Sequence, residues 1–460
     1  MNAPEFNLML TRRHLLKSAS AGFGYLAFAG LSSAETAKYQ SPMAPKQPHF
    51  QPRAKRVIFL CMRGGPAHQD TFDPKPQLKK RAGEKSQFRN GAKIQASPWN
   101  FRKHGQSGLE ISDLFPNVAK HADDLCLLRG MHTDLPNHPQ AFVQLHTGNF
   151  QFVRPSMGAW AVYGLGTENQ DLPGFITISP PVRLGGKQNY GSAFLPAFYQ
   201  GTAIGQERAA IKDAKLRNLK NKDLTPELQR KQLDLVQSMN RDLLKAQPGN
   251  QQIEGVIESF ELGFRMQSAV PEVMDLSDEP ASVQKMYGIG GKLTDNFGRQ
   301  CLMARRFAEA GVRFIEISHA SWDQHRSLKS SLTKNCGETD QPIGALLTDL
   351  KQRGMLQDTL IVWGGEFGRT PDGRRDDGRD HNAKGYSMWM AGGGVKGGLA
   401  YGATDEFGYE AVDNRTHIHD LHATMLHLLG LDHKQLTYRY AGRDFRLTDV
   451  YGNVAEEIVG

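Results

Sequence analysis

The sequence has few cysteines, and their spacing narrows the kinds of metal site that it can encode. Four cysteines occur among 460 residues, and no two of them form a Cys-x-x-Cys pair. This spacing argues against a zinc site built from thiolates alone. Cys61 and Cys126 lie inside apolar runs, which favours buried, unreactive thiols, and the spacing leaves open whether a disulfide forms.

Three other features are absent from the chain. No segment reaches the length of about 20 apolar residues that a membrane span needs. No dense Lys/Arg tract carries interleaved aromatic residues, and no Gly-Lys-Ser/Thr phosphate loop occurs. With a formal net charge of +8, 39% hydrophobic residues and 23% charged residues, we expect a globular protein that binds no nucleic acid. Its mild positive field favours anionic substrates.

Residues 1–34 have the pattern of a twin-arginine signal peptide. Arg12-Arg13 precede an uncharged, mildly apolar stretch from Ala19 to Leu31, and Ser32-Ser33-Ala34 offers small residues for cleavage. The alternative is an ordinary amphipathic helix. The pattern predicts export by the twin-arginine machinery to the periplasm or another place outside the cytoplasm. Residues 35–53, rich in Pro, Gln and Lys, indicate a flexible linker.

Residues 54–460 predict one α/β domain with a mostly parallel sheet between helices. Helices near 299–310 and 343–353 each end at a glycine and are each followed by an apolar run, and such alternation is typical of parallel sheets. We expect a helical insertion at about 205–300, in which Thr225-Pro226 begins a helix whose apolar stripe is a packing face. The expected strands are 56–62, 125–129, 174–178, 312–317 and 359–363, with a further apolar run at 386–390.

Carboxylates and histidines gather near the ends of these apolar runs. Ligands of open α/β sheets sit beyond the carboxyl ends of the strands, so we expect these side chains to converge. Mixed carboxylate and imidazole donors suit one or two divalent metal ions, with zinc, manganese, calcium and magnesium left open. The candidate ligands are Asp323, His325, Glu366, Asp380 and His381, joined by His68 and Asp70 in the loop after the first strand.

Each candidate also has a simpler interpretation. The loops that carry Asp323 and Asp380 could be solvated without holding a metal ion, and Glu366 could pair with Arg369 or Arg379. These two arginines are otherwise candidates for substrate binding, because a guanidinium group matches the oxygens of phosphate or sulfate in a bidentate manner.

Five short motifs in this region fit a known pattern. They are Gly64-Gly-Pro-Ala-His-Gln-Asp-Thr-Phe-Asp-Pro-Lys75, Trp322-Asp-Gln-His325, Gly365-Glu-Phe-Gly-Arg-Thr-Pro371, Gly378-Arg-Asp-His381 and Ala391-Gly-Gly-Gly-Val-Lys-Gly-Gly398. The chain from about residue 55 to the end thus resembles a bacterial family of exported, sulfatase-like proteins, known as a domain of unknown function within the alkaline-phosphatase-like superfamily. The resemblance implies a sheet with two metal ions at its strand ends and a nucleophile at the start of a helix.

The resemblance also shows a departure at the nucleophile. His138 falls where sulfatases have Cys or Ser, and no formylglycine can be made from histidine. Two routes to hydrolysis stay open: attack by water that a metal ion activates, or a role for His138 as nucleophile or general base. We expect a metal-dependent hydrolase of phosphate or sulfate esters, acting on an anionic small-molecule or saccharide ester, with His138 and Arg369 in catalysis. The alternative is a non-catalytic binding or scaffold protein on the same fold.

Overall fold

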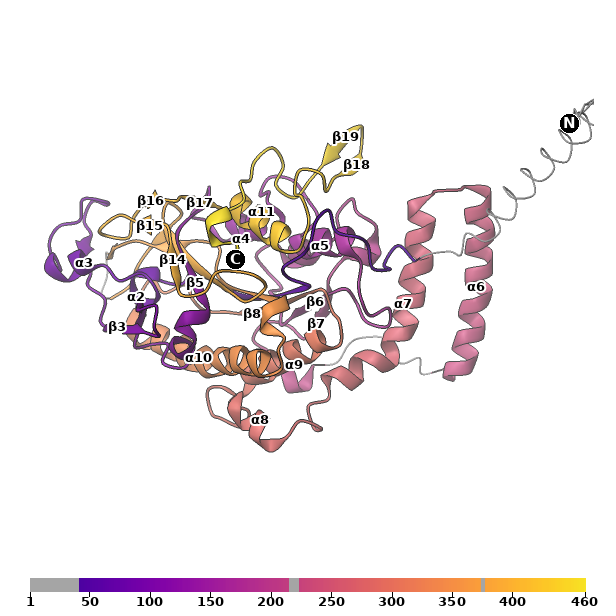
Figure 1. The fold of residues 1–460 in the computed structure, drawn as a ribbon, viewed down its shortest axis with the longest axis horizontal. Coiled ribbons are helices and arrows are strands. Elements are labelled where there is room, and N and C mark those ends of the chain that lie inside the picture. The colour runs from indigo at the N-terminus through magenta and orange to yellow at the C-terminus, as the bar shows by residue number, and fades with distance from the viewer. Residues whose placement is uncertain (1–40, 215–222, 374–376) are drawn as a thin grey trace, which may run out of the picture. The chain divides into compact units, whose positions relative to one another are not determined.

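A central sheet of nine strands forms the middle of the fold (Figure 1). The computed structural model describes residues 41–214, 223–373 and 377–460. The predicted signal peptide and the beginning of the predicted linker lie outside these residues. The strands are β1 (Arg56–Met62), β5 (Leu125–His132), β6 (Phe175–Ile178), β7 (Thr202–Ile204), β8 (Phe314–His319), β9 (Thr359–Gly364), β13 (Tyr386–Ala391), β14 (Leu399–Tyr401) and β17 (Thr416–His417).

The strand order is β14-β5-β13-β9-β1-β8-β6-β7, and β17 pairs with β5. Neighbouring strands run parallel except at β13, which is antiparallel to both β5 and β9. The predicted α/β class with a mostly parallel sheet is therefore confirmed. β1 is buried along its whole length because helices cover both faces of the sheet. Ile58 and Leu60 enter one core, while Val57 and Phe59 enter the other.

Two sets of helices form these two cores with the sheet. The core that receives Ile58 includes Phe297 and Leu346, from α9 (Asp295–Glu309) and α10 (Leu328–Gln352). The core that receives Phe59 includes side chains of α4 (His138–Thr147), α5 (Met157–Leu165) and α11 (Ile418–Leu428). α10 begins well before the predicted start at residue 343, because buried Leu328, Leu332 and Cys336 already recur at helical spacing.

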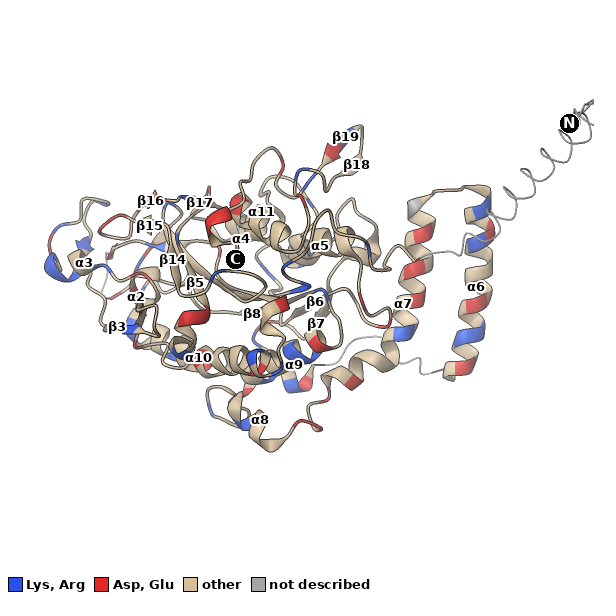
Figure 2. Ribbon diagram, in the orientation of Figure 1, with Lys and Arg blue, Asp and Glu red and all other residues tan. Residues whose placement is uncertain are grey.

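α6 (Pro226–Ala246) and α7 (Gln251–Met274) lie side by side, and Thr225 caps the first of them through the backbone N–H of Leu228. Acidic and basic residues both lie along α6 (Figure 2). Arg230 joins the helices through an ion pair with Glu261 at 2.8 Å. The prediction that the apolar stripe of α6 is a packing face is wrong, because the stripe residues are exposed, with Leu235 65% exposed and Met239 66% exposed. The buried residue of α6 is Gln237, whose side chain donates to the backbone carbonyl of Ile257 on α7.

Short elements connect these layers. The helices are α2 (His68–Thr71), α3 (Pro76–Lys80) and α8 (Ala281–Met286). The paired strands are β2 (Lys93–Ile94) with β11 (Asp372–Gly373), β3 (Phe101–His104) with β4 (Leu109–Ser112), β10 (Gly368–Arg369) with β12 (His381–Asn382), β15 (Ala403–Thr404) with β16 (Ala411–Asp413), and β18 (Tyr438–Tyr440) with β19 (Arg443–Phe445). Within the described parts of the chain, no helix combines the length and apolar character needed to cross a bilayer.

Candidate metal centre

Three neighbouring parallel strands bring their carboxyl ends together at one edge of the sheet. β9, β1 and β8 are adjacent, and the loops after them carry Glu366, Gly64 and Asp323. Both carboxylate oxygens of Glu366 accept the backbone N–H of Gly64 at 3.1 Å. The loops after three different strands therefore lie in mutual contact, as the pattern of apolar runs followed by polar residues predicts.

Glycine is required at position 64 for this contact. Its φ angle is +121°, a region that L-residues rarely adopt. A Cβ atom on Gly64 would lie 2.5 Å from the backbone nitrogen of Asp323. The glycine of the first motif thus allows the loop after β1 to pack against the loop after β8.

Three histidines surround one oxygen of Asp323. The Nε2 atoms of His138, His325 and His381 lie 3.2, 3.0 and 3.2 Å from Asp323 Oδ1. The Nε2 atoms of His325 and His381 are also only 2.9 Å apart. These side chains come from the first turn of α4, the loop after β8 and strand β12, so distant segments of the chain converge here.

The other ring nitrogen of each histidine points outward to an oxygen atom. His138 Nδ1 lies 2.6 Å from Glu366 Oε1, and His325 Nδ1 lies 2.6 Å from Asp380 Oδ1. His381 Nδ1 lies 2.8 Å from the carbonyl oxygen of Pro136. Metal-binding histidines commonly donate their second N–H to a carboxylate or carbonyl, which leaves the lone pair of the inner nitrogen free for the ion.

The carboxylates of the cluster favour a positive charge beside them. Burial opposes a charge on His138, but the carboxylates of Asp323 and Glu366 outweigh it and raise the pKa of His138 to about 9. Burial also opposes ionisation of Asp323, yet His138, His381 and Arg369 hold its pKa well below the usual range. Inward-facing nitrogens so close to a carboxylate need either a bound proton or a metal ion between them, and this donor set fits a divalent ion.

The two predicted substrate-binding arginines are themselves buried, and each pairs with a carboxylate. Arg369 Nη2 contacts Asp323 Oδ1 at 2.8 Å, and its Nε donates to the carbonyl of Gly65 at 2.8 Å. Arg379 Nε pairs with Asp70 Oδ2 at 2.7 Å, and neither side chain is exposed. The simpler interpretation, pairing with nearby carboxylates, describes both arginines in this structure. A substrate anion could reach Arg379 only if its pair with Asp70 opened.

The remaining candidates divide into two groups. His68 is buried, and its Nε2 lies 2.8 Å from the carbonyl oxygen of Gly408, while Asp70 is held by Arg379. Glu366 and Asp380 adjoin the three histidines on the outer side of the rings. The structure thus brings together His138, Asp323, His325, Glu366, Asp380 and His381, whereas the contacts of His68, Asp70 and Arg379 are made elsewhere.

One side of the cluster opens to solvent and the other rests on the protein interior. The side chains of His325 and Asp323 are 43% and 40% exposed, whereas that of Glu366 has no exposed surface. Solvent therefore reaches the cluster from one side. Sequence reasoning missed Arg89, which pairs with Asp380, and the carbonyl of Pro136. No motif marks Arg89, and a backbone acceptor leaves no signal in the sequence.

The mostly parallel sheet and the carboxylate–imidazole cluster at its strand ends define an α/β protein with a candidate metal centre. The chain belongs to the family described as "Protein of unknown function (DUF1501)", which it matches over residues 54–459. This assignment confirms the predicted domain-of-unknown-function family. A search of curated proteins gave no match.

Several solved structures are similar to the chain at low sequence identity. One is the PsFucS1 sulfatase from Pseudoalteromonas sp., with 11% identity, coverage of 82% of this chain and 68% of that chain, and a TM-score of 0.35. Another is the alkaline phosphatase from the Antarctic bacterium TAB5, with 11% identity, 84% and 99% coverage, and a TM-score of 0.35. A third is the C-terminal periplasmic domain of EcEptC from Escherichia coli in complex with Zn, with 8% identity, 85% and 88% coverage, and a TM-score of 0.35.

Proposed function

We propose that this protein is an exported, metal-dependent hydrolase of phosphate or sulfate esters. One observation carries the proposal: the Nε2 atoms of three histidines surround Asp323 Oδ1, and each Nδ1 is held by an oxygen acceptor. His138, His325, His381 and Asp323 would hold the ion. Nitrogen-rich ligands favour zinc over manganese, calcium and magnesium, which prefer oxygen. A bound ion of this class supplies a Lewis acid and lowers the pKa of water.

His138 acts in this proposal as a ligand rather than a nucleophile. Its Nδ1 is engaged by Glu366, and its Nε2 faces Asp323 within the cluster. Neither nitrogen is therefore free to attack a phosphorus or sulfur atom. Of the two routes left open by the sequence, this geometry supports the route in which the protein supplies no covalent nucleophile.

Glu366 and Arg369 position the ligands. Glu366 fixes the ring of His138, and Arg369 holds the carboxylate of Asp323 while its Nε is anchored to a backbone carbonyl. Both residues are buried, so neither contacts a substrate directly. Export to the periplasm rests on the Arg12-Arg13 pattern alone.

The test is turnover by the full, exported chain after its metal is exchanged. Protein stripped with a chelator is reloaded separately with zinc, manganese, magnesium or calcium, and the release of nitrophenol from nitrophenyl phosphate and nitrophenyl sulfate is followed. We expect turnover with zinc, and we expect His325→Ala to lose both this turnover and one equivalent of metal. His427→Ala, a matched control on α11 whose Nε2 lies 4.0 Å from Glu456, should keep both.

Two outcomes would overturn the proposal. If the wild-type protein binds no divalent metal, there is no metal centre. A protein that binds metal through His325 but hydrolyses neither ester with any ion of the panel is a binding or scaffold protein, as the missing sulfatase nucleophile allows.

A further inference from the structure

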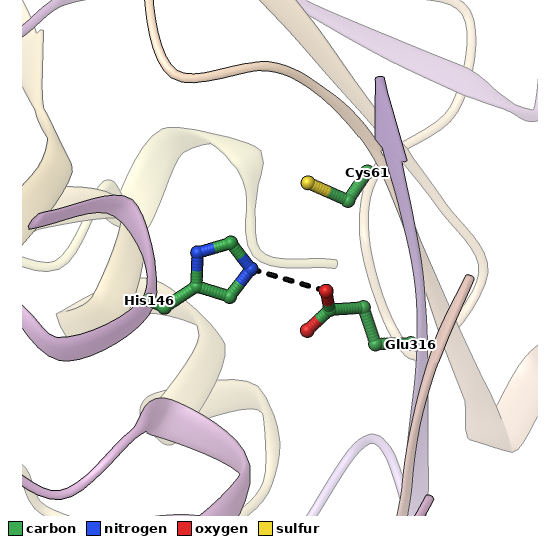
Figure 3. Close-up of side chains that lie close together, drawn as sticks. All are labelled: Cys61, His146 and Glu316. Atoms are coloured by element: carbon green, nitrogen blue, oxygen red, sulfur yellow. Dashed lines mark hydrogen bonds and ion pairs between the residues drawn. The ribbon is translucent and has the colours of Figure 1, made fainter. Parts of the chain in front are cut away.

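A second group of metal-ligand side chains lies in the core between the sheet and α4. Cys61 on β1, Glu316 on β8 and His146 in the last turn of α4 point toward one another (Figure 3). One ligand atom of each residue lies within 4.8 Å of the other two. Cys61 and His146 have no exposed surface and Glu316 is 2% exposed, so the group is sealed from solvent.

The strand register explains why these side chains share one face of the sheet. β1 and β8 are parallel neighbours, and Glu316 pairs with Phe59. Residues two apart on a strand point to the same side, so Cys61 and Glu316 both face the core that Phe59 enters. The side chain of Phe142, one turn before His146 on α4, packs in that same core.

The hydrogen bond of His146 to a backbone carbonyl places a proton on its outer ring nitrogen. His146 Nδ1 lies 2.7 Å from the carbonyl oxygen of Phe142, and a carbonyl can only accept, so the proton is on Nδ1. In the neutral ring Nε2 then carries the lone pair, whereas in the imidazolium it carries a second proton; in both states it faces Glu316 Oε1 at 3.1 Å. Two acceptors in contact inside a dry core repel each other unless a proton or a metal ion lies between them.

The carboxylate of Glu316 is also short of partners. Its Oε1 accepts a hydrogen bond from Ser318 at 3.2 Å. Its Oε2 is buried and makes no hydrogen bond within the described residues. A buried carboxylate oxygen without a donor is costly, and a bound cation would satisfy it.

We propose that Cys61, His146 and Glu316 bind a divalent ion of the zinc class at a site separate from the candidate metal centre. A thiolate and a carboxylate together balance the charge of a divalent ion, which a sealed core requires. Sulfur and imidazole ligands select zinc-like ions and disfavour calcium and magnesium. With three protein ligands, one position of a tetrahedral ion is left without a protein ligand.

This second ion would tie together three elements that carry the candidate metal centre. Cys61 precedes the loop of Gly64, Glu316 precedes the loop of Asp323, and His146 lies two turns after His138 on α4. The ion would fix the positions of β1, β8 and α4 relative to one another next to the first cluster. Its role is therefore structural, and it does not depend on whether the first cluster is catalytic.

Cobalt substitution tests the site in the whole protein. A cobalt ion bound by a thiolate absorbs strongly in the near ultraviolet through charge transfer, whereas cobalt bound only by histidine and carboxylate does not. We expect this band in wild type and in His325→Ala, which disrupts only the first cluster. Cys61→Ser should lose the band and one equivalent of zinc. Cys126→Ser, which changes a thiol buried in the same core, should keep both.

The outcomes distinguish the two metal sites and test one alternative, an ion pair without metal. If wild type shows no thiolate band, or if Cys61→Ser and Cys126→Ser bind equal zinc, the three residues hold no metal and His146 is an imidazolium paired with Glu316. If Cys61→Ser does not fold, Glu316→Gln replaces it as a variant of nearly equal shape, and an unchanged zinc content then overturns the proposal. Loss of metal in His325→Ala alone bears only on the first cluster.

Discussion

The ring of His138 and the carboxylate of Glu366 share a hydrogen bond of 2.6 Å between Nδ1 and Oε1. Glu366 is fully buried in the loop after β9, whereas His138 begins α4. The bond fixes which nitrogen of His138 faces Asp323. Burial opposes ionisation of Glu366, but its contacts with His138 and with backbone N–H groups outweigh it and lower its pKa, so the carboxylate stays charged.

Replacing this carboxylate should weaken metal binding without removing a ligand. An amide in Glu366→Gln holds the ring of His138 less firmly and makes its inner nitrogen less basic. We expect the affinity for zinc to fall about 10–100-fold, measured by competition with a chromogenic chelator. Glu338→Gln is the matched control, because Glu338 contacts His319 Nε2 at 3.1 Å outside the cluster. Equal affinities of both variants and wild type would contradict the role of Glu366.

The loop contact at Gly64 predicts a loss of stability on adding one methyl group. In Gly64→Ala the new Cβ would lie 2.5 Å from Asp323 N at a φ of +121°. The backbone strain alone costs about 1–3 kcal/mol, and the collision adds to it. Denaturant unfolding should therefore show a loss of more than about 2 kcal/mol, with a parallel loss of zinc affinity.

Gly83→Ala separates strain from collision. Gly83 also has a positive φ, +84°, but no described atom lies within 4 Å of its Cβ position. We expect a cost of about 1 kcal/mol from the left-handed backbone and no change in metal binding. If the two variants lost equal stability, the packing of the Gly64 loop against Asp323 would not matter.

The regular part of the fold could be predicted from local patterns. The run from Arg56 to Met62 is uniformly apolar because β1 is covered on both faces, and the predicted bounds match β1. β13 was recognised as an apolar run, but its antiparallel direction was not predicted. Because β13 is antiparallel to its neighbour β9, the chain between them returns at the same edge of the sheet, and no residue of the strand itself indicates this path.

For the candidate site, the sequence predicts which residues come together better than it predicts what each of them contacts. Asp323 and His381 were expected as ligands, and the structure places them 3.2 Å apart. Arg379 was expected to bind an anion, yet it is buried against Asp70, because the choice between an anion and a carboxylate partner depends on the fold. The group of Cys61, His146 and Glu316 left no motif, since its members are separated widely along the chain and meet only in the core.

The buried ion pair of Arg305 and Glu279 predicts sensitivity to acid. Burial opposes ionisation of Glu279, but hydrogen bonds from Arg305 and Arg306 outweigh it and lower its pKa. A folded-state pKa below the unfolded value means that the pair stabilises the fold above about pH 4.5, and that this contribution is lost as the pH falls further. In metal-free protein, the free energy of unfolding should fall more steeply with acid in wild type than in Glu279→Gln.

Asp278→Asn is the control for this pH dependence. Asp278 is exposed and adjacent in sequence, and the same loss of a carboxylate there should leave the acid dependence of wild type unchanged. If Glu279→Gln and wild type showed equal slopes below pH 4.5, the ion pair would contribute nothing to the acid response.

Replacing Arg369 with lysine tests whether the shape of the guanidinium, and not its charge alone, supports the centre. Arg369 donates from Nε to Gly65 O at 2.8 Å and from Nη2 to Asp323 Oδ1 at 2.8 Å, in a fully buried position. The ammonium of Arg369→Lys cannot reach both acceptors with the same geometry. A buried acceptor left without its donor costs about 1–3 kcal/mol, and Asp323 loses its anchor. We therefore expect lower stability by about that amount and weaker zinc binding.

Arg230→Lys is the control, because it changes a similar guanidinium group that contacts Asp234 and Glu261 at a partly exposed place. There the loss should stay below about 1 kcal/mol, because solvent screens the pair. Comparable losses in both variants would show that Arg369 acts through charge alone, and the proposed positioning of Asp323 would then fail.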